Sequence, residues 1–163
     1  MAEIALRFAT ADDCGTLLAL VRELAAYEQA SDAVLASEED FRRYGFGAER
    51  RFEALLAFVD ERPAGFALFF PNFSTWLGRP GLYLEDIFVA EWARKSGVGL
   101  RLMAKVAAIA VQRGGGRLDF WVLHWNPARD FYHRLGVGHM EEWLPYRAEG
   151  EALAALARED RKD

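Results

Sequence analysis

The stretch that most constrains the fold runs from Leu82 to Val111. Its apolar run, Leu82–Val89, is rich in aromatic and β-branched residues and carries two adjacent charges, Glu85 and Asp86. A glycine-containing segment, Arg94–Gly99, follows, and helical spacing begins after it. This order predicts a strand, a loop and a helix whose first-turn amides point at the loop. Such an arrangement suits phosphate or pyrophosphate.

Length and charge narrow the class of protein. With 163 residues, a mass of 18.4 kDa and 52% hydrophobic content, the chain is expected to form a single domain, residues 1–163. The formal net charge is −5, with acidic residues spread along the chain, so we expect no nucleic-acid partner. An acidic surface suits a cationic ligand.

The rarer residue types argue against several other classes. Cys14 is the only cysteine, so no internal disulfide forms, and core packing is expected for it. His124, His133 and His139 lack metal-ligand spacing, so we expect no metal. Residues 1–8 carry charges where a signal peptide needs an apolar segment, and no apolar run reaches membrane-spanning length. We expect a cytoplasmic protein without membrane contact.

The remaining patterns predict alternating elements around the central stretch. Strand patterns are expected at 3–9, 52–60, 64–73, 82–89, 117–123 and 142–147. The second and third of these read as a hairpin through Asp60–Pro63. Helices are expected after the Thr10–Asp13 capping box, after Ser37, across 98–111, after Asn126-Pro127 and around 153–156.

Three anion-binding loops compete for Arg94–Gly99. A P-loop needs Lys followed by Ser or Thr after the second glycine, but Leu100 and Arg101 stand there. A dinucleotide fingerprint needs a third glycine where Leu102 stands, and the acidic residue downstream, Asp119, begins its strand rather than ending it. The third form, Arg-x-x-Gly-x-Gly, fits.

That third form resembles the acyl-CoA loop of the GNAT N-acetyltransferases, and the order of elements matches theirs over essentially the whole chain. The resemblance is to the spermidine/spermine (diamine) and thialysine N-acetyltransferase branch, and it is carried by Glu23–Glu28, Gly45–Gly47, Trp76–Gly78, Leu82–Asp86 and Trp125-Asn126. It implies an α/β (α+β) GNAT fold with helices on both faces of a mixed, mostly antiparallel sheet. The sheet is splayed into a V between its fourth and fifth strands.

The resemblance also implies a cofactor, acetyl-CoA, and the residues that contact it. Backbone amides of the loop would hold the pyrophosphate, and the end of the preceding strand would pair with the pantetheine arm. The implied contacts are Ile87, Phe88, Val89, Arg94, Lys95, Ser96, Gly97, Val98, Gly99, Leu100 and Asn126.

Two residues are the candidates for proton transfer. An alkylamine has a pKa of about 10.4, so a base must take its proton before attack. Glu85, on a mostly apolar strand, is the candidate, either as base or only as an amine anchor, and Asp86 is expected on the opposite face in a structural role. Tyr132 matches the tyrosine that protonates the CoA thiolate in the family. A bulge near Ile87 is expected to provide the oxyanion contact.

The resemblance also implies, in less detail, the amine acceptor and the oligomeric state. Tyr27, Glu28, Glu85 and Glu141 match amine-contacting positions, and they suit a polyamine, thialysine or a lysine-like amine. Trp76 belongs to the candidate substrate wall, with simple packing as the alternative. The relatives form dimers, so a homodimer is expected, with the aromatic tail around Trp143 and Tyr146 as an interface.

Two departures from the family pattern leave alternatives open. Lys95-Ser96 stand where relatives commonly have an early glycine, and one residue is missing between Asn126 and Tyr132. One residue turns a helix by about 100°, which places the cofactor contact of Asn126 in question. The alternatives are a non-catalytic acyl-CoA sensor or scaffold, or acetylation of another amine such as a protein N-terminus or an aminoglycoside.

Overall fold

The computed structural model describes residues 3–161, which divide into two compact units, the first ending at Trp121 and the second beginning at Val122. The first unit contains β1 (Ile4–Phe8), α1 (Cys14–Tyr27), α2 (Glu38–Phe41), β2 (Glu53–Val59), β3 (Arg62–Ser74), β4 (Arg79–Val89), α3 (Val98–Gln112) and β5 (Leu118–Asp119). Short helical turns lie at Ala11–Asp13, Ser31–Ala33, Arg42–Phe46 and Glu91–Ala93. The second unit contains α4 (Ala128–Arg134), α5 (Gly150–Arg158) and a final turn at Glu159–Arg161.

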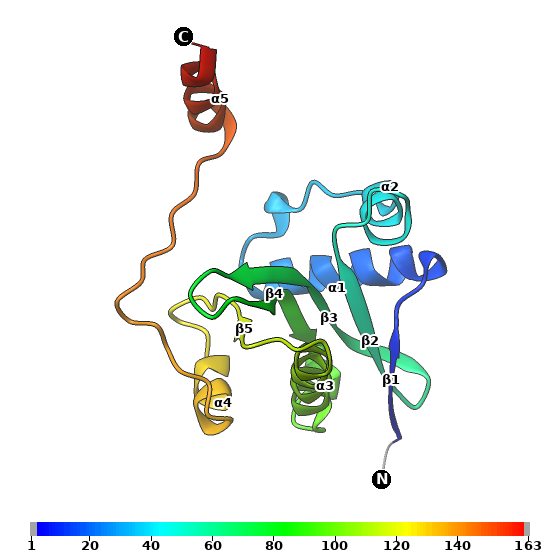
Figure 1. The fold of residues 1–163 in the computed structure, drawn as a ribbon. Coiled ribbons are helices and arrows are strands. Elements are labelled where there is room, and N and C mark those ends of the chain that lie inside the picture. The colour runs from blue at the N-terminus through cyan, green and yellow to red at the C-terminus, as the bar shows by residue number, and fades with distance from the viewer. Residues whose placement is uncertain (1–2, 162–163) are drawn as a thin grey trace. The chain divides into compact units, whose positions relative to one another are not determined.

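A five-stranded sheet in the order β1-β2-β3-β4-β5 is the centre of the first unit. The first four strands pair antiparallel, and β5 pairs parallel with β4, which confirms the predicted mixed sheet. The sheet lies between α1 and α3, and both helices contact β3 and β4 (Figure 1). Helices therefore cover both faces, as predicted.

The pairing of β4 with β5 is short. It joins Leu82 to Leu118 and Tyr83 to Asp119, whereas β3 pairs with β4 as far as Val89. Among the described residues, β4 beyond Tyr83 has no strand partner on its β5 side, which agrees with a sheet that splays between its fourth and fifth strands. The strand predicted over 117–123 shrinks accordingly to two residues.

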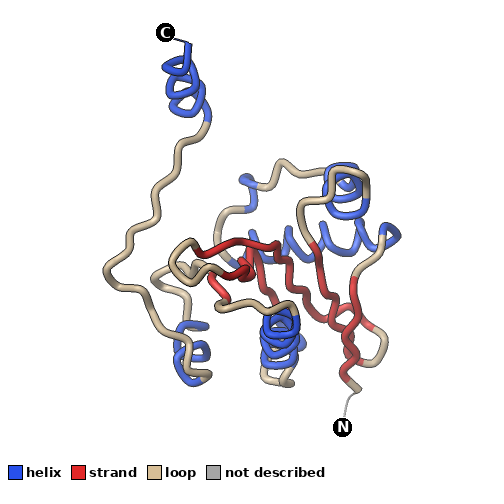
Figure 2. Tube along the Cα trace, in the orientation of Figure 1, coloured by secondary structure: helices blue, strands red, loops and turns tan. Residues whose placement is uncertain are grey.

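The strand predicted at 142–147 is absent, and residues 138–149 have neither helix nor strand (Figure 2). A strand needs a neighbour to receive its backbone hydrogen bonds. Within the described part of the second unit no other strand is present to supply them. The alternating apolar pattern of this segment is therefore not accompanied by backbone hydrogen bonds to a neighbouring strand.

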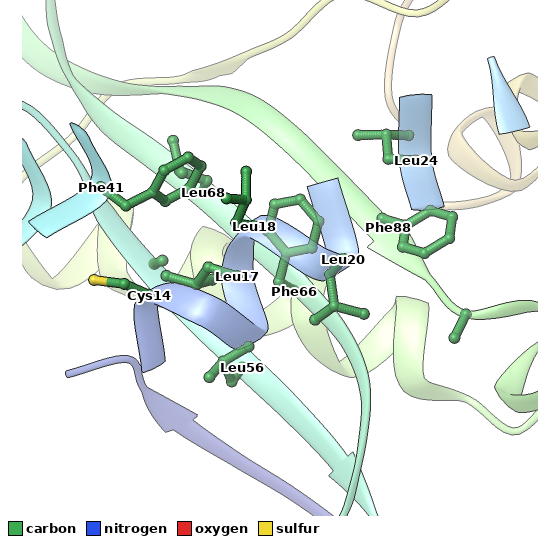
Figure 3. Packing of buried hydrophobic residues seen from close by; sticks show 12 residues of the cluster. Cys14, Leu17, Leu18, Leu20, Leu24, Phe41, Leu56, Phe66, Leu68 and Phe88 are labelled. Atoms are coloured by element: carbon green, nitrogen blue, oxygen red, sulfur yellow. The ribbon is translucent and has the colours of Figure 1, made fainter. Parts of the chain in front are cut away.

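The α1 face of the sheet carries a continuous apolar core (Figure 3). Leu17, Leu20 and Leu24 of α1 pack against the sheet with Phe66 and Phe88. Cys14 is 1% exposed in the same cluster, which confirms its predicted packing role. Deep burial raises the pKa of the Cys14 thiol.

The first helix is fixed at its start by a buried carboxylate. Asp13 accepts hydrogen bonds from the Arg7 guanidinium at 2.7 and 2.9 Å and from the Thr10 amide at 2.7 Å, which confirms the predicted capping box. The bond from Arg7, aided by the Thr10 contacts, lowers the pKa of Asp13 to about 2 despite its burial. The predicted cap of α2 by Ser37 is confirmed as well, and Asp40 completes a capping box there.

Candidate active site

The loop after β4 is shaped by two left-handed residues. Lys95 has φ 65° and Gly97 has φ 94°, so the chain reverses sharply before α3. A left-handed lysine is uncommon, whereas glycine adopts this conformation without a steric cost. The Ser96 hydroxyl donates to the Ala93 carbonyl at 2.5 Å and holds the turn from inside. The predicted loop is therefore a fixed structure.

The start of α3 presents the first-turn backbone amides that the sequence predicts. No side chain caps it, and the Arg101 amide is the donor to the Gly97 carbonyl, at 3.1 Å. The amides of Val98, Gly99 and Leu100 precede that first turn and have no carbonyl within the helix to bond. Four helical turns add their dipole behind these amides. The site fits the pyrophosphate of an acyl-CoA, whose charge these amides complement.

The end of β4 leads into this loop and, within residues 3–161, has a strand partner on one edge only, although the Val89 carbonyl also accepts a hydrogen bond from Arg94 Nε. Ile87, Phe88 and Val89 pair with β3 on one side only. The Phe88 side chain is 6% exposed and belongs to the core under α1. The Phe88 side chain is therefore turned into the core, and a contact of this strand end with a pantetheine arm stays a prediction.

A bulge in β4 corrects the predicted placement of the two acidic residues. Leu68 pairs with Asp86 and Phe69 pairs with Leu84, so Glu85 is an extra residue in β4. The bulge lies two positions before the expected Ile87. Strict alternation, which predicted opposite faces for Glu85 and Asp86, does not hold where two residues oppose one.

The burial of the acidic pair is the reverse of the prediction. Glu85 is exposed, whereas Asp86 is half-buried. Desolvation, followed by the negative charges of Glu85 and Glu28, raises the pKa of Asp86 to about 6. Desolvation also raises the pKa of Glu28. Glu28 and Glu85 therefore lie within electrostatic range of Asp86, and the strongly perturbed carboxyl is Asp86, for which the sequence predicts a structural role.

The Arg94 side chain is held against the end of α1. Its Nε donates to the Val89 carbonyl at 3.2 Å, and its Cζ lies 4.5 Å from the centre of the Tyr27 ring. Tyr27 was predicted from the resemblance as an amine contact. In the structure its ring faces a loop arginine, while the next residue, Glu28, lies within electrostatic range of Asp86.

Trp76 does not pack. It lies in the turn between β3 and β4 and is 90% exposed, so the simple packing reading is wrong. The turn is held by the Ser74 side chain, which accepts a hydrogen bond from the Leu77 amide at 3.1 Å. The role of Trp76 in substrate binding stays a prediction.

The second unit carries Tyr132, Asn126 and Glu141. Tyr132 is buried on α4, 5.4 Å from the Phe131 ring, and its carbonyl accepts from the Val137 amide at 3.1 Å. Asn126 Oδ1 accepts from the Ala128 amide at 2.9 Å, which confirms the predicted cap. Glu141 is exposed in the irregular segment. The catalytic and cofactor roles of these residues remain predictions.

Two general features of the chain bear on the class of site. Within residues 3–161, no three His, Cys, Asp or Glu side chains are grouped so that they could hold a metal ion. None of the described helices combines the length and apolar character needed to cross a membrane.

Residues 17–137 match the family model described as Acetyltransferase (GNAT) family. The chain belongs to this family. It is 40% identical to the thialysine N-epsilon-acetyltransferase of Bos taurus over 96% of this chain and 99% of that protein. It is also 31% identical to the human spermidine/spermine N(1)-acetyltransferase-like protein 1, over 95% of this chain and 24% of that longer protein.

Solved structures agree with the family. An integron cassette protein from the mobile metagenome of V. cholerae superposes with a TM-score of 0.80 at 30% identity, covering 95% of this chain and 98% of that one. An aminoglycoside N-acetyltransferase in complex with CoA gives a TM-score of 0.70 at 21% identity over 92% of this chain and 97% of that one. These structures support the predicted fold, and the family match and its thialysine acetyltransferase relatives support the N-acetyltransferase class and the use of an acyl-CoA.

Proposed function

We propose that this protein transfers the acetyl group of acetyl-CoA to a primary amine of a small cationic acceptor, with both substrates bound together. One observation carries the proposal: a single strand, β4, presents the bulged acidic pair and then leads into the uncapped start of α3. The first feature suits a cation and the second suits a polyphosphate. Residues 1–163 would act as one acetyltransferase domain.

The cofactor side of the proposal uses main-chain groups. Acetyl-CoA supplies a thioester, whose acyl carbon is open to attack by a neutral amine. The amides from Lys95 to Leu100 would receive its pyrophosphate, and the edge of Ile87–Val89 that carries no strand partner would align the pantetheine arm. The Ile87 amide would stabilise negative charge on the acyl oxygen.

The acidic trio provides both attraction and basicity. Glu28, Glu85 and Asp86 together favour a cation that carries more than one charge, such as a polyamine, thialysine or a lysine-like amine. A base works best when its pKa lies near the working pH, and the pKa of Asp86, about 6, is closer to that range than an ordinary carboxyl pKa. We therefore propose Asp86 as proton acceptor, with the predicted base, Glu85, as the alternative.

Tyr132 is the proposed proton donor. When the amine nitrogen bonds to the acyl carbon and the carbon–sulfur bond breaks, the sulfur leaves as a thiolate and needs a proton. The family match of Tyr132 supports this role, and its burial on α4 limits competition from bulk water. Asn126 and Glu141 are kept as proposed contacts to the cofactor and the amine, and Trp76 as part of the acceptor wall.

A panel of acceptors tests the proposal. Purified protein is incubated with acetyl-CoA and spermidine, spermine, thialysine, lysine, ornithine, aminoglycosides or peptides, and thiol release is followed. Fast release with a small diamine or thialysine is expected. Tight CoA binding without thiol release in the presence of any amine would support a non-catalytic sensor instead. Thiol release only with peptides or aminoglycosides would show that the acceptor belongs to one of those classes.

We also propose a cytoplasmic homodimer joined through the C-terminal arm, defined here as residues 139–158. The arm exposes Met140, Trp143, Leu144, Tyr146, Leu153 and Leu156. Large apolar side chains exposed in such number along one segment are typical of an interface. A second copy offers the strand partner that the segment 142–147 lacks. Sedimentation should give about twice the 18.4 kDa chain mass, and the monomer mass would reject the proposal.

A further inference from the structure

The C-terminal corner of α1 is a rigid platform for two neighbouring side chains. The helix is closed by the Ala30 amide, which donates to the Ala25 carbonyl at 2.8 Å, and by Gln29 in the left-handed region at φ 59°. Tyr27, its last residue, and Glu28, its cap, are both half-buried. Their directions are therefore set by the helix end.

Arg94 rests on this platform from the loop side. Tyr27 covers one face of the guanidinium at 4.5 Å, and the Phe88 ring lies 6.0 Å away. Nε is bonded to the Val89 carbonyl. The arginine is exposed, and within the described part of the chain neither of its Nη atoms donates a hydrogen bond. The guanidinium is thus oriented while its two outer nitrogens stay available to an anion.

We propose that Tyr27 is a positioning residue for Arg94, and that it serves the cofactor phosphates rather than the amine. This inference rests on the proposed use of acetyl-CoA. A free arginine loses rotamer freedom when it binds phosphate, so an aromatic face that holds it beforehand reduces that cost. The cation–π contact supplies the hold without occupying any N–H group.

The proposal divides two consecutive residues between two ligands. Tyr27 acts through Arg94 on the acyl-CoA, whereas Glu28 adds its charge to the Asp86 carboxyl. If the end of α1 contributed only to stability, substitutions of Tyr27 and Glu28 would not affect the two ligands separately. Removal of the ring should affect cofactor binding, and removal of the Glu28 charge should affect the amine.

Titration calorimetry with CoA is the direct test. Tyr27→Leu is expected to weaken CoA binding by about threefold to tenfold, the range of a partly exposed cation–π contact. Tyr27→Phe keeps the ring and should restore the affinity. Pantetheine, which lacks the phosphates, should bind Tyr27→Leu and the unchanged protein equally. The matched control is Tyr44→Leu, which removes a similar ring from Arg43 at 5.0 Å, outside the loop.

Steady-state kinetics provide the second readout, with the amine that the unchanged protein acetylates fastest. Tyr27→Leu should raise the KM for acetyl-CoA and leave the KM for the amine unchanged, and Glu28→Gln should do the reverse. A rise in amine KM alone, or equal CoA affinity in Tyr27→Leu, overturns the positioning role. Failure of the unchanged protein to bind CoA overturns the proposed function itself.

Discussion

The two units differ in how they satisfy their apolar side chains. The first unit buries large residues on both faces of its sheet, with Phe66, Phe69 and Leu102 at 0% exposure. The second leaves Trp143 66% and Tyr146 88% exposed, and α5 contains no buried residue. A sheet with helices on both faces supplies its own partners, whereas a short helix followed by an irregular arm does not.

The proposed chemistry is distributed unevenly over the same two units. The anion loop, the acidic trio and the Arg94–Tyr27 contact belong to the first, and Tyr132 belongs to the second. This distribution predicts that binding and proton donation can be separated by mutation.

The largest effect is expected from Tyr132→Phe in the second unit. Loss of a general acid lowers a rate by about 100-fold or more, so kcat should fall by that factor. CoA affinity by calorimetry should persist, because the proposed phosphate contacts belong to the first unit. An unchanged kcat would remove Tyr132 from the donor role and would confine the chemistry to the first unit.

The next effect is expected from Asp86→Asn. If Asp86 accepts the amine proton, kcat/KM should fall by about tenfold to 100-fold at neutral pH. Glu85→Gln is the comparison variant at the neighbouring position. A larger loss in Glu85→Gln than in Asp86→Asn would return the role of base to Glu85.

The pH profile of the unchanged protein sharpens this test. Asp86 must be ionised to act, so kcat/KM should fall as the pH decreases through about 6. Glu28→Gln removes a neighbouring negative charge, which lowers the pKa of Asp86 and should move this limb to lower pH. A limb that stays in place would mean that a different group controls the rate.

Asp86→Asn, which should lower activity, should raise the free energy of unfolding at high pH. The folded-state pKa of Asp86 lies above its usual 3.8, so its contribution to stability is lost as the pH rises towards 6. Asp86→Asn should therefore be more stable than the unchanged protein at pH 8, by up to about 3 kcal/mol. The gain should vanish near pH 4. Urea unfolding at both pH values measures it, and an equal gain at both would exclude the ionisation as its cause.

A smaller effect is expected when the arm is altered. Trp143→Ser combined with Tyr146→Ser should shift the sedimenting mass towards 18.4 kDa and leave the CoA affinity of the first unit intact. The exposed residue Leu35 offers a control, since Leu35→Ser removes a similar apolar surface outside the arm. A dimer that survives the double change would place the interface elsewhere.

The smallest effect is expected from Asp13→Asn. The Asp13 pKa is lowered to about 2, so its stabilisation is present at neutral pH and is lost as the pH falls through that value. The Arg7 side chain is 49% exposed, so solvent screening limits the cost at pH 7 to about 1–2 kcal/mol. Urea unfolding checks it. Glu151→Gln, in the exposed pair with Arg158, should cost almost nothing, and equal costs would contradict the distinction.

Much of the fold was predictable because its signals are local. The Thr10–Asp13 box, the Arg94–Gly99 loop and the Asn126 cap each depend on residues a few positions apart. The failures concern pairing between distant segments. The strand expected at 142–147 needs a partner that the described chain does not supply, and the bulge at Glu85 arises from its register with β3. Two adjacent acids in an apolar strand were the available signal for that bulge.

The extra residue in β4 has a consequence for how acceptor preference can change in this family. In a regular strand, side chains alternate between faces, so two charges on one face must be separated by a residue of the opposite face. A bulge removes that requirement and lets neighbouring positions work as a pair. A shift of the bulge by one residue would regroup the acidic side chains without altering the amino-acid composition. Strand register is thus a route to new specificity that a comparison of residue identities alone would miss.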